Sequence, residues 1–401
     1  MIVFNRKSIF AFSVFMLSPV AGIMVALHNA KKSQFNFIYF LISLFFAVVF
    51  LKNPPLDDLY RYLEMYDHLN PNIIFNEFNN YSVFFAISYF FKMIGVPFYL
   101  MVSFFNFLII FFALKSLHLV FLKLNWGVKF HLFAILCIII IMNPLLASLS
   151  VRAPLSVSLY TYGFLSYFLS NRFKGCFFIF LSVVFHFSFV YLVLAFIASN
   201  LVKINVKLSL LLSILFFSIS SFVLPSLIPL IPIAQISDQY SNYVTNTAVG
   251  EGGEGISAQI VNMILFITVI YFFIAGLVFS PHKDDFFLNK IHSKLLILVP
   301  FICLSAFQYL VFYRYSLSVL LIFCIYLLSF IYKYKNNLLF ISLGVILVVN
   351  LIIVDLYIRK NSLIYGEPIT QAFLSPILNI EYTDAEYREV LKYIDKNGLL
   401  K

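Results

Sequence analysis

The sequence predicts an all-α polytopic integral membrane protein, and three observations lead to this fold class. Hydrophobic residues make up 62% of the 401 residues and charged residues only 11%, against about 25% charged residues in soluble globular proteins. Phenylalanine alone accounts for 51 residues, and the mean hydropathy is +0.98. Apolar runs of roughly 17 to 25 residues recur along the chain, and each is long enough to cross a hydrocarbon core about 30 Å thick. The expected solvent is therefore the bilayer.

Ten apolar runs predict membrane-spanning helices: 8–27, 35–51, 98–117, 131–148, 154–170, 208–224, 259–279, 295–312, 315–332 and 338–358. Two more runs are shorter or interrupted. Residues 81–94 predict a partial span, and residues 176–199 predict a hairpin with His186 near its outer tip. The expectation is about 10 to 12 transmembrane helices in one membrane domain, residues 1–358, and an extramembrane tail, residues 359–401. In the tail, a capping box of Thr383 and Glu386 predicts a short helix over 383–398.

The orientation of the spans follows from the lysines and arginines, which are enriched in cytoplasmic connections. Connections expected in the cytoplasm carry Lys31 and Lys32, Lys115, Lys123 and Lys129, Arg172 and Lys174, Lys203 and Lys207, Lys283, Lys290 and Lys294, and Lys333 and Lys335. Residues 208–282 contain neither residue type, so the loop near 225–258 is expected to face outward. Counting the spans, with 81–94 as a partial span, places the loop near 52–80 outward as well. The same count of spans also places Arg6 and Lys7 outward, which conflicts with the rule that lysine and arginine are enriched on the cytoplasmic side.

The stretch "NPPLDDLYRYLEMYDHL", residues 53–69, concentrates charge between two apolar runs. Proline ends the preceding span, and a helix begins just after it. Its apolar residues fall on one side, namely Leu56, Leu59, Leu63 and Tyr66. Asp57, Arg61, Glu64 and His68 fall on another, which predicts an amphipathic helix on the outer membrane surface. Asp58 lies off the polar stripe, so the two acids are not expected to act equally.

Charged groups at outward span ends are the candidate functional residues: Asp57, Asp58, Arg61, Arg152 in "LSVRAPLS", His186 in "FHFS" and Arg314 in "FYRYS". By the predicted topology they gather on one membrane face. An arginine that sinks to the bilayer centre costs about 2.5–3.5 kcal/mol on insertion scales, so its presence needs a reason. A ligand with phosphates, such as a lipid-linked diphosphate, would provide one, because guanidinium stays charged and matches phosphate oxygens. An adjacent acid could take a proton from a sugar hydroxyl, and His186 titrates near neutrality.

Structural roles remain open for each of these residues. Asp57 and Arg61 could form a surface i,i+4 ion pair, with Asp57 or Asp58 as a helix cap. Arg152 could extend to lipid headgroups, His186 could hydrogen-bond between helices, and Arg314 could be an interfacial anchor. The candidate sugar-binding residues are Tyr60, Tyr62, Tyr240 and Tyr243; the last two could equally belong to a flexible linker.

Four segments in this order resemble the EpsG family of membrane proteins and the related Wzy-type O-antigen and capsule polymerases. They are "DDLYRYLEMY", "VRAPLSVSLYTYGFLSYFLSNRFK", "FIFLSVVFHFSFVYL" and "FYRYS". The family more often has Gly-Thr-Asp before the first tyrosine and glycine after the central arginine, where this chain has "PLDD" and "VRAP". The resemblance therefore leaves open whether Asp57 or Asp58 is the key acid.

The resemblance implies a multi-pass inner-membrane glycosyltransferase that polymerises undecaprenyl-diphosphate-linked oligosaccharide units on the periplasmic side. Arg61, Arg152 and Arg314 would stabilise the departing diphosphate, Asp57 or Asp58 would be the base, and His186 would assist either role. We expect neither a metal nor another cofactor, because the diphosphate carrier already activates the donor. Expected partners are the lipid-linked oligosaccharide and membrane lipids, with a chain-length regulator and a flippase as further candidates and no nucleic acid.

Two other classes compete with this interpretation. A membrane O-acyltransferase that decorates the polysaccharide would also use an intramembrane histidine and arginines. A flippase or other transporter would be expected to have paired repeat halves, which the sequence does not contain.

Overall fold

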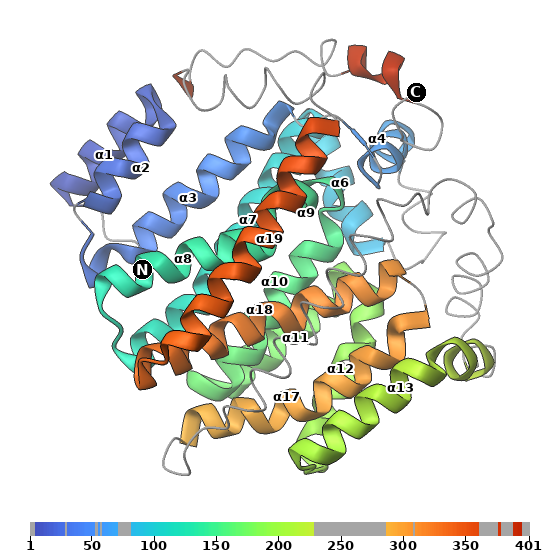
Figure 1. Ribbon diagram of the computed structural model, residues 1–401. Helices are drawn as coiled ribbons and strands as arrows, with labels where there is room; N and C mark the ends of the chain where they lie inside the picture. The colour runs from blue at the N-terminus through green and yellow to red at the C-terminus, as the bar shows by residue number, and fades with distance from the viewer. Residues whose placement is uncertain are drawn as a thin grey trace. The chain divides into compact units, whose positions relative to one another are not determined.

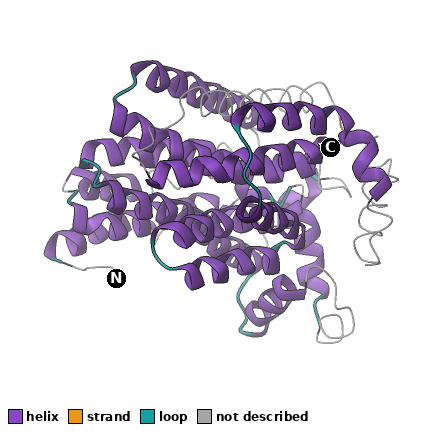
Figure 2. Cartoon of the chain, turned by 90° about the horizontal axis from the view of Figure 1, so that it is seen from below, coloured by secondary structure: helices purple, strands orange, loops and turns teal. Residues whose placement is uncertain are grey.

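The structure is a computed structural model that describes residues 5–28, 30–52, 55–56, 58–70, 82–227, 286–307, 309–360, 376–377 and 388–394. These described residues are helical almost throughout and form no β-strand, which confirms the all-α prediction (Figure 2). Four helical segments are long and apolar enough to cross a membrane: Lys32–Val49, Phe98–Leu124, Phe286–Leu304 and Arg314–Tyr334. Shorter apolar helices accompany them, as expected for a polytopic membrane protein.

The chain forms two compact units. The first unit comprises Met1–His186 and Leu347–Lys401, and the second unit comprises Phe187–Ile346. Each is described by itself below.

The first predicted span, residues 8–27, is wrong as a single helix. It divides into α1 (Arg6–Leu17) and α2 (Pro19–His28), because Ser18 is extended and Pro19 starts a new helix (Figure 1). Gly22 lets α2 fold back against α1, since a Cβ atom there would lie 2.3 Å from Phe15 Cα. The helices have 12 and 10 residues, or roughly 18 and 15 Å, so neither crosses a hydrocarbon core by itself.

Two antiparallel helices, α3 (Phe35–Val49) and α7 (Phe98–Leu124), confirm the next predicted long spans. Ser103 Oγ donates to the Ala47 carbonyl at 2.7 Å, and Lys115 Nζ donates to Asn36 Oδ1 at 2.7 Å near the other ends of these helices. Between them along the chain lie α4 (Asp58–His68) and α6 (Ser82–Met93). With 12 residues, α6 has the length of the predicted partial span.

The predicted span 131–148 is also interrupted. It consists of α8 (Val128–Met142) and α9 (Pro144–Leu149), with Asn143 in the left-handed region at φ 44° between them. Asparagine tolerates this conformation, and Pro144 cannot continue the preceding helix. The chain then turns through residues 150–151 into α10 (Arg152–Leu169).

Two glycines allow α10 to pack closely against the antiparallel α11 (Arg172–Phe185). A Cβ atom on Gly163 would lie 2.7 Å from the Ile179 backbone nitrogen, and one on Gly175 would lie 2.6 Å from Tyr167 Cα. Small residues at such crossings let helix backbones approach within a membrane. Gly163 of α10 faces Ile179 of α11. About two turns further along the chain of α11, His186 therefore lies level with the first turn of the antiparallel α10.

Replacing Gly163 with alanine should destabilise the protein by about 1–3 kcal/mol, because the new methyl group overlaps the α11 backbone. The measurement is the midpoint of thermal unfolding in detergent. Gly344→Ala is the matched control, since Gly344 is also helical and a Cβ atom there meets nothing within 4 Å. Equal melting temperatures for the two variants would contradict this packing.

The second unit contains α12 (Val190–Leu201), α13 (Val206–Leu227), α17 (Phe286–Leu304) and α18 (Tyr309–Tyr334). The Ser209 hydroxyl of α13 donates to the Leu296 carbonyl of α17 at 2.5 Å, and Lys294 Nζ donates to the Ser199 carbonyl at 2.6 Å. The predicted span 295–312 is shifted, because α17 begins at Phe286 and the chain turns at residues 305–307.

The remaining predictions have mixed outcomes. Predicted spans 208–224, 315–332 and 338–358 lie in the helices α13, α18 and α19 (Asn337–Lys360), and the α18 segment is long and apolar enough to cross a membrane. The predicted span 259–279 lies outside the described residues. The predicted break at His186 is present, because α11 ends at Phe185 and a short turn, Phe187–Phe189, leads into α12. The hairpin itself stays a prediction. Of the predicted tail helix 383–398, residues 388–393 are helical and end in the short 3-10 turn Val390–Tyr393.

Candidate functional site

Helix α4 is the amphipathic helix that the charged stretch predicts. Its apolar residues Leu59, Leu63 and Tyr66 are buried, whereas Arg61 and Glu64 are exposed. Asp57 lies outside the described residues, so its role stays a prediction. The helix therefore packs its apolar face against the first unit and keeps much of its charge outside.

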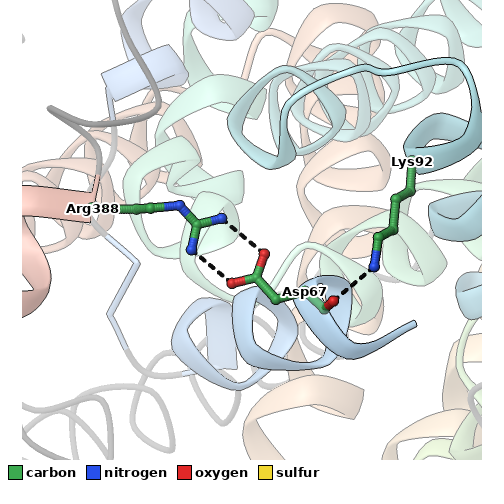
Figure 3. A network of polar contacts seen from close by, with 3 residues as sticks. All are labelled: Asp67, Lys92 and Arg388. Carbon is green, nitrogen blue, oxygen red and sulfur yellow. Dashed lines mark hydrogen bonds and ion pairs between the residues drawn. The ribbon is translucent and has the colours of Figure 1, made fainter. Parts of the chain in front are cut away.

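Several contacts hold the C-terminal end of α4. The Tyr66 hydroxyl donates to the Val96 carbonyl at 2.5 Å, and the Tyr66 ring centroid lies 5.5 Å from that of Phe98. Lys92 Nζ donates to the Asp67 carbonyl at 2.7 Å and to the Leu69 carbonyl at 3.1 Å (Figure 3). Lys92 thus satisfies carbonyl groups that a helix end leaves without helical partners.

Arg152 is the first residue of α10 and is only 4% exposed. Its guanidinium carbon lies 5.9 Å from the ring centroid of Tyr62 in α4 and 5.6 Å from that of Phe84 in α6. The two ring centroids are 5.1 Å apart. A cation over aromatic rings is stabilised by their negative faces, most strongly where water is excluded. The alternative role of extending to headgroups does not fit so buried a side chain.

Asp58 forms an ion pair with Arg61, whereas the alternative Asp57–Arg61 pair lies outside the described residues and stays a prediction. The Asp58 side chain is 16% exposed and the Arg61 side chain 63% exposed. Asp58 and Tyr62 are four residues apart on the helix, so they share a face. Asp58, which the sequence pattern leaves off the polar stripe, therefore lies on the side of α4 that carries the ring beneath Arg152.

His186 lies at the same end of α10 and α11 as Arg152. The ring centroid of its neighbour Phe185 lies 6.3 Å from that of Phe105. The Phe105 centroid lies 5.4 Å from that of Phe84, and the Phe84 ring contacts Arg152. A continuous set of aromatic rings thus connects the end of α11 to the Arg152 site. The structure brings Asp58, Arg61, Tyr62, Arg152 and His186 to one end of the first unit, while Tyr60 is half-buried on α4.

Arg314 belongs to the second unit, where it is half-buried. Its neighbour Tyr315 donates a hydrogen bond to the Ser188 carbonyl at 2.9 Å and stacks on Tyr191, with ring centroids 5.1 Å apart. These contacts fix the backbone beside Arg314. Tyr240 and Tyr243 lie outside the described residues, so their predicted role stays a prediction.

The opposite end of the first unit carries its own cations. Lys32 of the turn before α3 hydrogen-bonds Asn125 after α7, and Lys174 Nζ lies 5.2 Å from the Tyr162 ring centroid. Arg172 lies 5.9 Å from the Tyr167 ring centroid. The charge rule predicts that this lysine-bearing end faces the cytoplasm and that the Arg152 end faces outward, and this orientation stays a prediction.

In the described parts of the chain, no group of three His, Cys, Asp or Glu side chains is gathered as a metal site requires. The expectation of no metal and no cofactor nevertheless stays a prediction, because Asp57 and residues 228–285 are not among the described residues.

Two residues of the network in Figure 3, Lys92 and Arg388, are absent from the sequence-based candidates. Arg388 binds Asp67 at the end of α4 from a position 321 residues away in the chain. No local pattern of residues marks such a contact.

The protein-family model described as the EpsG family matches residues 35–365 of the chain. The match begins with α3 and includes Asp58, Arg152, His186 and Arg314, whereas Arg388 lies beyond it. No curated protein and no solved structure matches the chain.

Proposed function

Because the chain belongs to the EpsG family, whose members are Wzy-like polymerases, we propose that it polymerises undecaprenyl-diphosphate-linked oligosaccharide units. The product is a bacterial surface polysaccharide, either O-antigen, capsule or exopolysaccharide. The chain is a multi-pass membrane protein, and we assign it to the inner membrane with its active site on the periplasmic side.

The buried Arg152 carries this proposal. A guanidinium that is withdrawn from water and braced by two rings at a helix end has its position fixed before a ligand arrives. Such a group stabilises developing negative charge with little reorganisation. The diphosphate of a lipid-linked oligosaccharide carries negative charge and lies at the level where a membrane span ends. There the more exposed guanidinium of Arg61 can donate further hydrogen bonds to it.

In the proposed reaction, a hydroxyl group at the non-reducing end of the new lipid-linked unit attacks the anomeric carbon of the growing chain. The bond from that carbon to the diphosphate oxygen breaks, and undecaprenyl diphosphate leaves with the bonding electrons. Asp58 accepts the proton of the attacking hydroxyl, while Arg152 and Arg61 stabilise the leaving diphosphate. His186, at the same end of the first unit, assists either the base or the arginines that stabilise the diphosphate. Tyr60 is proposed to contact a sugar.

Two residues receive revised or separate roles. Tyr62 is assigned to holding Arg152 rather than to binding sugar, because its ring is buried against the guanidinium. Arg314 is proposed, from the sequence pattern, to contribute a further positive charge.

Deletion of the gene that encodes this chain should leave lipid carriers or lipopolysaccharide with a single repeat unit. A gel of extracted polysaccharide should accordingly lack the ladder of long chains. A ladder of normal length without acetyl groups would instead indicate the O-acyltransferase, and loss of even the single unit would indicate the flippase. Either result would refute the proposed polymerase activity.

A further inference from the structure

Arg388 ties the C-terminal segment to the last turn of α4 (Figure 3). Its Nη1 atom lies 2.7 Å from Asp67 Oδ2, and its Nη2 atom lies 2.8 Å from Asp67 Oδ1. This is the two-bond geometry in which guanidinium and carboxylate recognise one another most specifically. The ion pair is therefore a directed contact between two segments that are far apart in the sequence.

Asp67 is held from two sides at once. Arg388 binds its carboxylate, and Lys92 binds its backbone carbonyl. The segment beyond Arg388 also carries a buried apolar side chain, because Ile394 is only 4% exposed. The C-terminal segment thus contacts α4 through a two-bond ion pair.

Helix α4 needs such support. It has 11 residues, and isolated helices of this length are marginal in water. Asp58 and Arg61 occupy its first turn, and their positions relative to Arg152 depend on the tilt of the whole helix. A shift of about 1 Å at a reacting group can lower a rate by about two orders of magnitude.

We propose that residues 388–394 form a clasp that positions α4 for polymerisation, with Arg388 and Asp67 as positioning residues. This inference rests on the proposed function for its activity measurement, but not for its structural one. The clasp is separate from the groups proposed to contact substrate.

Electrostatics support the clasp at physiological pH. The hydrogen bonds from Arg388 hold the pKa of Asp67 below its ordinary value, and the charges of Arg388, Lys92 and His68 act in the same direction. Because the folded-state pKa is lowered, the pair contributes stability above the ordinary pKa of aspartate. That contribution is lost only as the pH falls through the lowered pKa. The clasp therefore stays closed over the whole physiological range.

The test compares full-length variants in lipid nanodiscs. Hydrogen exchange of the α4 amides should become about fivefold faster in Arg388→Ala, as expected for loss of a two-bond ion pair that is only partly exposed. The initial rate of polymerisation of lipid-linked repeat units should fall by a similar factor. Arg388→Lys, which keeps the charge but not the fork, should lie between Arg388→Ala and the wild type.

Asp67→Ala discriminates better than Arg388→Ala between a clasp and its absence. A negative charge in the last turn of a helix interacts unfavourably with the helix dipole, so removal of that charge alone should stabilise α4. Without a clasp, removal of that charge would slow exchange in α4; with a clasp, it should accelerate exchange. The double variant should differ from Asp67→Ala by less than Arg388→Ala differs from the wild type, since the ion pair is already absent in Asp67→Ala. Lys392→Ala is the matched control, because Lys392 is a cation of the same segment that pairs with Glu389 at 3.0 Å rather than with Asp67.

The outcomes separate the two proposals. Unchanged α4 exchange in Arg388→Ala, relative to Lys392→Ala, would overturn the clasp whatever the activity. Faster exchange with an unchanged polymerisation rate would overturn the positioning role. Faster exchange in a protein whose wild type does not polymerise repeat units would refute the proposed function and leave the docking of the clasp intact.

Discussion

Replacing Arg152 with alanine is expected to abolish the polysaccharide ladder while the protein stays in the membrane at its normal level. The variant removes the buried guanidinium that lies against the rings of Tyr62 and Phe84 at the first turn of α10. Loss of a preorganised group that stabilises a leaving anion lowers rates by about 10²–10³-fold, which would stop chain growth at one or a few units. The measurements are the gel of extracted polysaccharide and an immunoblot of the membrane fraction.

Three variants separate the loss of charge from a loss of packing. Arg152→Lys should give an intermediate ladder, because lysine keeps the charge without the planar fork. Tyr62→Phe should keep a normal ladder, since the ring remains under the guanidinium. Arg172→Ala is the matched control, because Arg172 also lies over a tyrosine ring but at the opposite helix end. A normal ladder in Arg152→Ala would refute the proposed diphosphate site.

The second large effect is expected for Asp58→Asn, which should lower the polymerisation rate by about 10²–10⁴-fold. Asparagine has nearly the shape of aspartate and supports a helix start equally well, so a purely capping residue would tolerate the change. A general base would not, because the amide cannot accept the proton of the attacking hydroxyl. The initial rate with lipid-linked repeat units is the direct measurement.

Glu64→Gln is the control for Asp58→Asn, since Glu64 is another acid of α4 but is exposed to solvent. This variant should polymerise at the wild-type rate. If Asp58→Asn did so too, the assignment of Asp58 as the base would fail, and Asp57→Asn would be the variant to measure next.

The amphipathic helix α4 could be predicted from sequence because its signal is periodic and local. The broken spans were predictable in principle from Ser18–Pro19 and Asn143–Pro144, since a residue before proline is disfavoured in a helix. A count of apolar residues missed both breaks, because it averages over about 20 positions and a single residue decides whether a helix continues. The outward position of Arg152, by contrast, rests on the predicted topology and stays a prediction.

The environment of Arg152 could not be predicted in the same way. Aromatic residues make up 19% of the chain, so nothing in the sequence distinguishes Phe84 from other phenylalanines. The contact between Arg388 and Asp67 joins residues 321 positions apart and leaves no periodic trace. Contacts of both kinds depend on how separate helices meet, which residue spacing within one helix does not encode.

The folded-back pair of α1 and α2 changes how insertion of this protein into the bilayer can begin. If α1 and α2 together return to the side from which they start, α3 is the first full crossing, and Arg6, Lys7, Lys31 and Lys32 all remain on one side. The polypeptide then need not translocate any of these four cations across the membrane as it leaves the ribosome. Under that condition α3 crosses with its basic flank on the same side as Arg6 and Lys7, and the next segment on the opposite side is the one that carries α4.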